Sequence, residues 1–539
     1  MTAIRNILWI SFEDTSPRFG CYGDNIARTP KVDALAAKGL QYNQALTTAA
    51  ICAPSRCSII TGMYASSIGC HHMRTSRVSE VFPELPTPYD GVPPAYVKCF
   101  TEYLRAAGWF CTNNGKTDYQ FGNPASAWDL NQITSEEDQE TAHWRQRPDP
   151  TQPFFAVFNL GITHESGQWP SYHRAPAVTD PGTVTLPPYL PDTPVTRRCL
   201  AQQYDHIADN DRRVGVLLQQ LEDDGLADST AVFIWSDHGE GLPYRKSWPR
   251  YAGVQVPLIV CAPGVPADTS CDDIVSLIDL GPTVLSLLGQ AIPAHMQGQA
   301  LLGPQARPHR RYAFATRDRI GESYDHMRTV FDQRYTYIRN YLPTTSRGPM
   351  QFYRHKHPTY QELYRLEASQ ELTSDQRWLF TPRPAEELYD RHQDPHELHN
   401  LAADPAQRET LERLRAALTA WQHDSKDMGD IDEVSMVRGW YPAGRQPETT
   451  TPMAIPISAE HAGMDHVASN ATITASAPLR LLVQSGTQGA STEVRINKGP
   501  WRPCDHALNL SAGNYQVEAR AIRYGFAPSA ISQWAVSVN

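Results

Sequence analysis

The sequence predicts an α/β fold with a large mixed sheet flanked by helices, followed by a smaller α+β region and a terminal β-sandwich. Short, nearly continuous apolar runs, typical of strands buried on both faces, occur at residues 6–11, 153–159, 230–235 and 256–260. Helical patterns lie between them, over residues 32–39, 49–61 and 197–224. This alternation favours a sheet with helices on both faces, and we assign residues 1–300 to it.

The remaining chain is predicted to form further units. Residues 301–425 contain a strand pair at 327–330 and 334–340 and form the smaller α+β subdomain. Residues 426–456 are rich in Pro, Gly and Thr, which predicts a linker. Residues 457–539 show no helical period. Strand-like runs at 471–475, 479–483 and 515–519 predict a β-sandwich there. A sugar-binding module and a structural appendage both fit this last unit, and the appendage is favoured.

Composition narrows the possible partners and compartments. The 539 residues are 41% hydrophobic and 20% charged, as in globular proteins of several domains. With 48 Lys plus Arg against 58 Asp plus Glu, the net charge of −10 argues against a general polyanion-binding surface and hence against nucleic acid. We expect no membrane span and no signal peptide, so the chain as written is expected to be cytoplasmic; after removal of a leader it would be periplasmic or secreted. The ten cysteines show no CxxC pair and no disulfide framework.

The most informative motif begins at Cys52. The letters CAPSR at 52–56, closed by TG at 61–62, resemble the signature of type I, formylglycine-dependent sulfatases of the alkaline phosphatase superfamily. The resemblance implies that a formylglycine-generating or anaerobic sulfatase-maturating enzyme oxidises Cys52 to formylglycine, whose hydrated diol attacks a sulfate ester or sulfamate. Arg56, four residues on in a helix, would face the same way and hold the diol and the sulfate. The alternative is a buried structural Cys before a helix with an early Pro.

Two pairs of candidate metal ligands follow predicted strands. Glu13 and Asp14 end the first strand, and Asp237 and His238 end a later one. Carboxylates are hard oxygen ligands. The resemblance implies that these four residues and Cys52 bind one divalent cation, calcium. Glu13 stands where the family usually has Asp, and His238 where Asn is frequent, so manganese or zinc would also suit the imidazole nitrogen. A solvated pair capping a helix is the alternative for either pair alone.

Basic residues complete the resemblance. Lys116 matches the family's lysine that contacts sulfate and formylglycine, and Asp118 stands where a His is common and could orient Lys116 or a sugar hydroxyl. His164 matches the histidine that binds sulfate and protonates the leaving group, although single histidines are more often structural. Lys246 matches the basic residue that the family places beyond the Asp237–His238 pair and would be a proton donor if its pKa were lowered.

The middle of the chain resembles the heparan N-sulfatase (N-sulfoglucosamine sulfohydrolase) branch, at residues 186–194, 209–211 and 221–225. This similarity implies a sulfated mono- or oligosaccharide substrate bearing a sulfamate or an O-sulfate. The candidates to grip a sugar or uronate, each of them individually more often a surface residue, are His71, His72, Arg74, Arg317, Arg319 and His326.

These observations predict a calcium-dependent sulfatase that takes part in sulfated polysaccharide degradation. Two alternatives remain open at this point. One is a phosphonate or phosphate monoester hydrolase of the same superfamily. The other is a non-catalytic sulfated-glycan-binding protein in which Cys52 stays a thiol.

Overall fold

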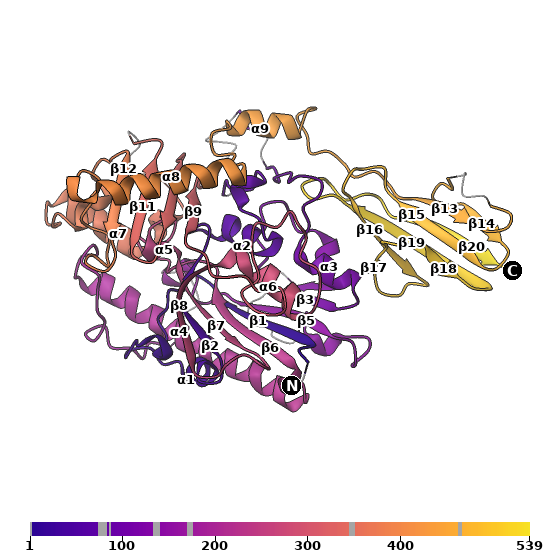
Figure 1. The fold of residues 1–539 in the computed structure, drawn as a ribbon, viewed down its shortest axis with the longest axis horizontal. Coiled ribbons are helices and arrows are strands. Elements are labelled where there is room, and N and C mark those ends of the chain that lie inside the picture. Colours follow the sequence, from indigo (N-terminus) through magenta and orange to yellow (C-terminus); the bar gives the residue numbers. More distant parts are fainter. Residues whose placement is uncertain are drawn as a thin grey trace.

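The main sheet is mixed, as predicted. The computed structural model describes residues 3–73, 84–85, 88–132, 141–169, 176–343, 351–461 and 466–539. Within them the main sheet has the order β4-β3-β5-β1-β6-β7-β2-β8 (Figure 1). Its strands are β1 (Asn6–Phe12), β2 (Leu40–Leu46), β3 (Phe110–Asn114), β4 (Leu130–Gln132), β5 (Phe154–Leu160), β6 (Thr230–Ser236), β7 (Gln255–Cys261) and β8 (Thr269–Ser276). The strands from β4 to β6 in this order run parallel, and β7 runs antiparallel to both of its neighbours.

Helices cover both faces of this sheet, which explains the continuous apolar runs in its central strands. Ile7 and Trp9 of β1 pack with the side of the sheet covered by α2 (Cys52–Thr61), α3 (Phe100–Ala106) and α6 (Leu280–Leu287). Leu8 and Ile10, which point to the opposite face, pack with α1 (Pro30–Ala36) and the long α4 (Pro194–Asp223). The short α5 (Tyr251–Val254) leads directly into β7.

A second, antiparallel sheet lies at one end of the molecule (Figure 1). Its order is β12-β11-β10-β9, with bounds β9 (Ala313–Arg317), β10 (Met327–Phe331), β11 (Tyr335–Asn340) and β12 (Glu386–Asp390). The predicted strand pair corresponds to β10 and β11. Helix α8 (Arg408–Ser425) packs on this sheet through Leu411, Leu414 and Leu418, and α7 (Pro358–Ala368) packs against α4.

The C-terminal strands form two sheets at the opposite end of the molecule (Figure 1). One has the order β13-β15-β18 and the other β14-β20-β19-β16-β17. Their bounds are β13 (Met453–Ile457), β14 (Thr472–Ala475), β15 (Leu479–Gln484), β16 (Ser491–Ile496), β17 (Arg502–Pro503), β18 (Leu508–Leu510), β19 (Gly513–Ile522) and β20 (Ser532–Val538). Leu481 from the first sheet and Val517 and Trp534 from the second share one apolar core, as in a β-sandwich.

The segment predicted as a linker, residues 426–456, is partly regular. Helix α9 (Glu433–Trp440) lies within it, and the Asp432 carboxylate caps the helix by accepting from the backbone N–H of Ser435. Val437 is fully buried against Tyr89 and Tyr441. Strand β13 begins at Met453, inside the same segment. The Pro and Gly residues between α9 and β13 dominate the composition of this segment. The composition therefore indicated a linker, although the apolar positions on either side belong to a helix and a strand.

The sandwich packs against the loop that follows β3. The ring of Tyr524 stacks on Phe121 with centroids 4.9 Å apart and an interplanar angle of 5°. The Tyr524 hydroxyl accepts a hydrogen bond of 3.0 Å from the backbone N–H of Cys99. A buried ion pair of 2.6 Å joins Arg105 of α3 to Glu493 of β16. These contacts make the end of β19 part of the core beneath the main sheet.

None of the helices in the described ranges combines the length and the apolar character that a bilayer span requires. The longest, α4, has 30 residues and buries only one side of its surface.

Candidate active site

The candidate residues meet at one edge of the main sheet. Strands β3, β5, β1 and β6 are consecutive neighbours and parallel, so their carboxyl ends lie side by side. The residues delivered by these ends are Lys116, His164, Glu13, Asp14, Asp237 and His238. The site is therefore a product of strand order, in which segments more than 200 residues apart in sequence become neighbours.

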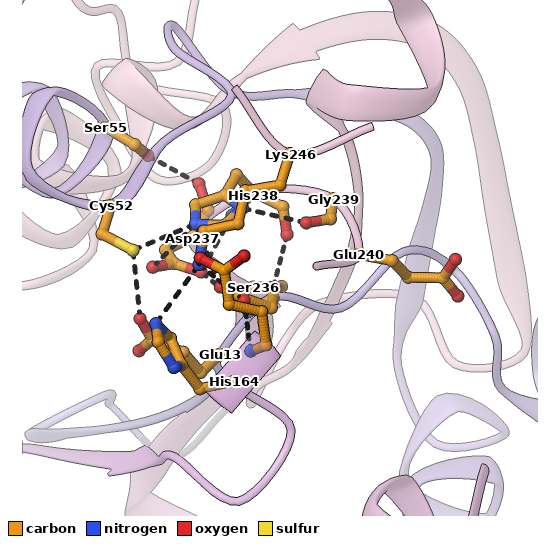
Figure 2. A network of polar contacts seen from close by, with 12 residues as sticks. Glu13, Cys52, Ser55, His164, Ser236, Asp237, His238, Gly239, Glu240 and Lys246 are labelled. Atoms are coloured by element: carbon orange, nitrogen blue, oxygen red, sulfur yellow. Dashed lines mark hydrogen bonds and ion pairs between the residues drawn. The ribbon is translucent and has the colours of Figure 1, made fainter. Parts of the chain in front are cut away.

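Cys52 is the first residue of α2 and points into this cluster (Figure 2). The preceding Ile51 is extended, with φ −154° and ψ 145°, and every residue of α2 is buried. Ser55 Oγ donates to the carbonyl oxygen of Asp237 at 2.6 Å, which fixes the start of α2 to the end of β6. The Cys52 sulfur lies 3.2 Å from His238 Nε2 and 3.4 Å from Glu13 Oε1. Burial raises the pKa of the Cys52 thiol well above its ordinary value.

Arg56 lies one helical turn after Cys52 and binds three partners. Its guanidinium donates to Glu13 at 2.6 Å, to Asp237 at 3.1 Å and to the side-chain oxygen of Asn159 at 2.8 Å. Burial alone would lower the pKa of Arg56, but the two carboxylates raise it above its usual value. Arg56 therefore joins the ends of β1, β5 and β6 to helix α2.

The acidic residues form a set of donors that fits a divalent cation. Ligand atoms of Asp14, Cys52, Asp237 and His238 all lie within 4.8 Å of one another, and Glu13 belongs to an overlapping set. No hydrogen bond reaches the buried Oδ1 of Asp14 in the described part of the chain. This oxygen lies 3.1 Å from His238 Nε2. Burial raises the pKa of Asp14 to about 6.

The tautomer of His238 agrees with a ligand role. Its Nδ1 lies 2.9 Å from the carbonyl oxygen of Gly239 (Figure 2). Because a carbonyl can only accept, Nδ1 carries the proton, and in a neutral imidazole Nε2 then offers its lone pair to the cluster. Hard carboxylate oxygens and one imidazole nitrogen suit Ca²⁺ or Mn²⁺.

Two lysines border the acidic cluster. Lys116 Nζ lies 2.5 Å from Glu13 Oε1 and 3.3 Å from Asp118, so Asp118 contacts the lysine that it was expected to orient. Lys246 Nζ donates to Asp14 Oδ2 at 2.7 Å and lies 3.2 Å from His164 Nε2.

The lysine charges also set the ionisation of their neighbours. Although burial lowers it, nearby negative charge, Asp14 foremost, holds the pKa of Lys246 well above its usual value, so the lowered pKa considered from the sequence is not found. Burial and the charges of Lys246 and Lys116 lower the pKa of His164, which is therefore a neutral imidazole.

Comparison with known proteins identifies the family. The family model described as Sulfatase matches residues 5–290, more than half of the chain. The chain belongs to the sulfatase family. This sulfatase is 36% identical to an ulvan-active sulfatase of Formosa agariphila, over 99% of this chain and 91% of that protein. It is 28% identical to the human N-sulphoglucosamine sulphohydrolase, over 78% of this chain and 91% of that one. The predicted family is thus confirmed, and the protein is a sulfuric ester hydrolase that cleaves sulfate esters or sulfamates.

Solved structures confirm the fold of the sulfatase. BT4656, determined in complex with its substrate D-glucosamine-2-N,6-O-disulfate, matches with a TM-score of 0.57 and 17% identity over 80% of this chain and 100% of that chain. The phosphonate monoester hydrolase of Agrobacterium radiobacter matches with a TM-score of 0.56 and 17% identity over 79% and 97%. At these identities the likeness shows the shared architecture alone.

Most residues expected to grip a sugar have interior positions in the sulfatase. Arg319 is fully buried, and its guanidinium donates to both carboxylate oxygens of Glu433, at 2.6 and 2.5 Å. His71 and His72 are also buried, with ring centroids 4.2 Å apart. The expectation that these three are surface residues does not match the structure, in which all three are buried and Arg319 pairs with a carboxylate from α9. Their contact with a sugar stays a prediction.

The other sugar-binding candidates differ among themselves. Arg317 is 3% exposed and pairs with Asp325 at 2.8 Å. His326 is buried with its ring stacked on Tyr341 at 4.2 Å, and its contact with a sugar stays a prediction. Arg74 lies outside the described residues.

The structure adds two residues that the sequence reasoning missed. Asn159, in β5, accepts from Arg56 and has no motif of its own. Glu165 pairs with Lys246 at 2.9 Å, and its backbone N–H donates to Asp14 Oδ2 at 2.7 Å. Its position directly after His164, at the end of a central strand, was the available signal.

Proposed function

We propose that this sulfatase removes sulfate from a sulfated saccharide at the cluster around Cys52. Three relatives support the substrate class: one is ulvan-active, one is a sulphohydrolase of N-sulphoglucosamine, and BT4656 takes a glucosamine disulfate as substrate. The observation that carries the proposal is the position of Cys52, which opens α2 where four parallel strands deliver carboxylates and lysines to one point.

Cys52 is proposed to act as formylglycine. The raised pKa of its thiol keeps the sulfur protonated, and a protonated thiol is a weak nucleophile. Oxidation by a maturation enzyme, either formylglycine-generating or anaerobic sulfatase-maturating, would supply a hydrated aldehyde whose hydroxyl attacks sulfur.

Glu13, Asp14, Asp237 and His238, together with residue 52, would hold one divalent cation. We favour calcium on the three carboxylates, and the nitrogen of His238 is also compatible with manganese. When bound, the cation would polarise a sulfate oxygen.

The remaining residues have separate tasks. Lys116 and Lys246 present positive charge to the nonbridging oxygens of the substrate, where negative charge must be stabilised in the transition state. The neutral His164 lies beside the protonated Lys246, so we assign protonation of the leaving group to this pair. The guanidinium of Arg56 donates hydrogen bonds to Glu13, Asp237 and Asn159, and it thereby holds the two carboxylates in position.

The test compares the wild type with Cys52→Ala after co-expression with a maturation enzyme. We expect the wild-type peptide containing residue 52 to show the mass of formylglycine and the enzyme to hydrolyse an aryl sulfate faster than an aryl phosphonate. Cys52→Ala should keep its fold and lose turnover by at least about 10⁴-fold. Cys504→Ala, a change of the same type in the sandwich, should keep full activity. Wild-type activity in Cys52→Ala, or an unmodified thiol in active enzyme, would contradict the mechanism.

A further inference from the structure

A pocket beside Lys246 extends the site beyond the reacting sulfate. Its lining includes Lys246 and Glu165 from the cluster described above, and Ile51, the residue before Cys52. The other walls come from Met73, from residues 320–322 and from the segment at Gln351, Tyr353 and Arg354. A sugar whose sulfate reaches residue 52 would therefore place its neighbouring substituents in this pocket.

Arg354 is a buried cation without an ionic partner. The residue is 8% exposed and lines the pocket. No carboxylate lies within 4.0 Å of it among the described residues. Its guanidinium lies over the ring of Tyr360, 5.6 Å from the centroid, and makes a long hydrogen bond of 3.4 Å to the carbonyl oxygen of Lys246. Two acids line the pocket: Glu165 is paired with Lys246 at 2.9 Å, and Glu322 lies more than 4.0 Å from the Arg354 guanidinium. A buried unpaired charge is costly, so this arrangement favours an anion supplied by a ligand.

The wall behind Arg354 adds further unused donors. Ser247, 1% exposed, also lines the pocket, and its hydroxyl makes no hydrogen bond to any described residue. Its carbonyl oxygen accepts from Arg317 at 2.7 Å, and Nη2 of Arg317 also lacks a partner within the described ranges. Arg317 shares its carboxylate, Asp325, with Arg383 at 2.8 Å. Behind Ser247, two buried arginines therefore share one carboxylate.

The apolar part of the lining suits the rest of a sugar ring. Ile51, Met73 and Ile320 offer an apolar surface that C–H groups can contact. The ring of Tyr353 stands at the rim, 39% exposed, with its centroid 4.6 Å from that of Trp169. An aromatic side chain with an apolar face and a polar, solvent-exposed end is suited to contact an amphipathic ligand such as a sugar.

We propose that Arg354 and Ser247 form a subsite for a second anionic group of the substrate, a carboxylate or a second sulfate carried on the saccharide beside the sulfate that is removed. The inference rests on the proposed saccharide function and narrows it to multiply anionic substrates. A planar guanidinium binds either oxyanion through two parallel hydrogen bonds, and Ser247 Oγ can donate a third.

The experiment measures kcat/KM on four substrates with matured enzyme: an aryl sulfate, a monosulfated disaccharide with a uronate, the same disaccharide with its carboxyl group reduced, and a disulfated neutral disaccharide. For Arg354→Gln we expect kcat/KM on one of the doubly anionic sugars to fall about 30-fold relative to kcat/KM on the aryl sulfate, chiefly through KM. The substrate that shows this loss identifies the group as carboxylate or sulfate. Arg354→Lys should recover part of the lost kcat/KM on that sugar, again measured relative to kcat/KM on the aryl sulfate.

A charge-matched control is available two residues away. Lys356 is exposed, and its ammonium lies over Trp169 at 4.9 Å, outside the pocket lining. Lys356→Gln removes the same charge. It should leave kcat/KM on the doubly anionic sugar, relative to kcat/KM on the aryl sulfate, within about twofold of the wild-type value. An equal loss on all four substrates would overturn the subsite and assign Arg354 to the support of Lys246. An unchanged ratio in Arg354→Gln would overturn it as well.

Binding measured without turnover tests the subsite at Arg354 separately from the proposed reaction on a saccharide. Calorimetric titration of the uronate disaccharide and the disulfated disaccharide into Cys52→Ala, with and without Arg354→Gln, reports the subsite directly. Loss of binding on removal of Arg354 would support the subsite even if matured enzyme failed to cleave these sugars, a failure that would count against the proposed saccharide reaction. Equal binding by both proteins would overturn the subsite.

Discussion

Replacing Arg56 by lysine tests whether the shape of the guanidinium, beyond its charge, holds the site together. Arg56 is 4% exposed and donates to Glu13, Asp237 and Asn159. An ammonium group keeps the charge but cannot reach three acceptors that surround a planar fork. If two charge-assisted hydrogen bonds are lost at about 1.5 to 3 kcal/mol each, the free energy of unfolding falls by about 3 to 6 kcal/mol.

The assay is urea unfolding in the presence of a chelator, so that no added cation neutralises Glu13 and Asp237. The midpoint should shift to lower urea while the slope stays unchanged. Arg408→Lys is the control, because the side chains of Arg408 and its partner Glu412 are 80% and 54% exposed, and such a surface pair contributes about 0 to 1 kcal/mol. In matured enzyme, kcat/KM on an aryl sulfate should fall about 10- to 100-fold as the carboxylates lose their support. Equal midpoints for Arg56→Lys and the control would refute the reasoning.

Further expectations concern the cation, pH and the sandwich. Asp237→Asn should weaken calcium binding at least about 100-fold, measured by titration after chelation, because a buried ligand charge is removed. Burial lowers the pKa of His71 to about 3, whereas the unfolded chain protonates near 6.5, so the unfolded state takes up the proton first. The free energy of unfolding should therefore fall as pH drops from about 6.5 toward 3, by up to about 1.4 kcal/mol per pH unit, and His71→Gln should flatten that slope. Tyr524→Ala removes the stack on Phe121, which lies in the loop after Lys116, and should lower kcat/KM on an aryl sulfate about tenfold, while Tyr524→Phe keeps most of it.

Each of these expectations has a clear contrary result. Unchanged calcium affinity in Asp237→Asn would remove that residue from the ligand set. Parallel stability profiles for the wild type and His71→Gln would show that another group causes the acid sensitivity, and His423→Gln, at an exposed position, serves as the surface reference. Full activity in Tyr524→Ala would show that the lysine loop keeps its position without the sandwich.

The central strands and the residues at their ends could be predicted because both signals are local. Runs such as residues 6–11 are apolar without interruption only when both faces of the strand are covered, and the polar residues that follow, such as Glu13 and Asp237, then mark the carboxyl edge of the sheet. The motif at Cys52 is likewise contained in a few consecutive residues. Such features need no knowledge of distant contacts.

The features that were missed depend on partners far away in sequence. Arg319 looks like a surface or ligand-binding cation until Glu433, 114 residues later, is brought against it. Asn159 gains a role only because β5 lies beside β1 and faces Arg56. The pocket at Arg354 combines segments from six parts of the chain, and the segment that carries Arg354 has no motif of its own. Sequence patterns indicate which elements form, whereas these pairings arise from how the elements dock.

The depth of the sulfur in Cys52 determines when its proposed oxidation can occur. No part of residue 52 is exposed, and α2 is enclosed along its whole length once Ser55 has joined it to β6. A modifying enzyme needs direct access to the sulfur, so it must work while residues 52–62 are still an extended stretch that it can read as a linear peptide. Protein that folds before Cys52 is oxidised would stay inactive. The yield of active enzyme would therefore depend on the rate of maturation relative to the rate of folding in the producing cell.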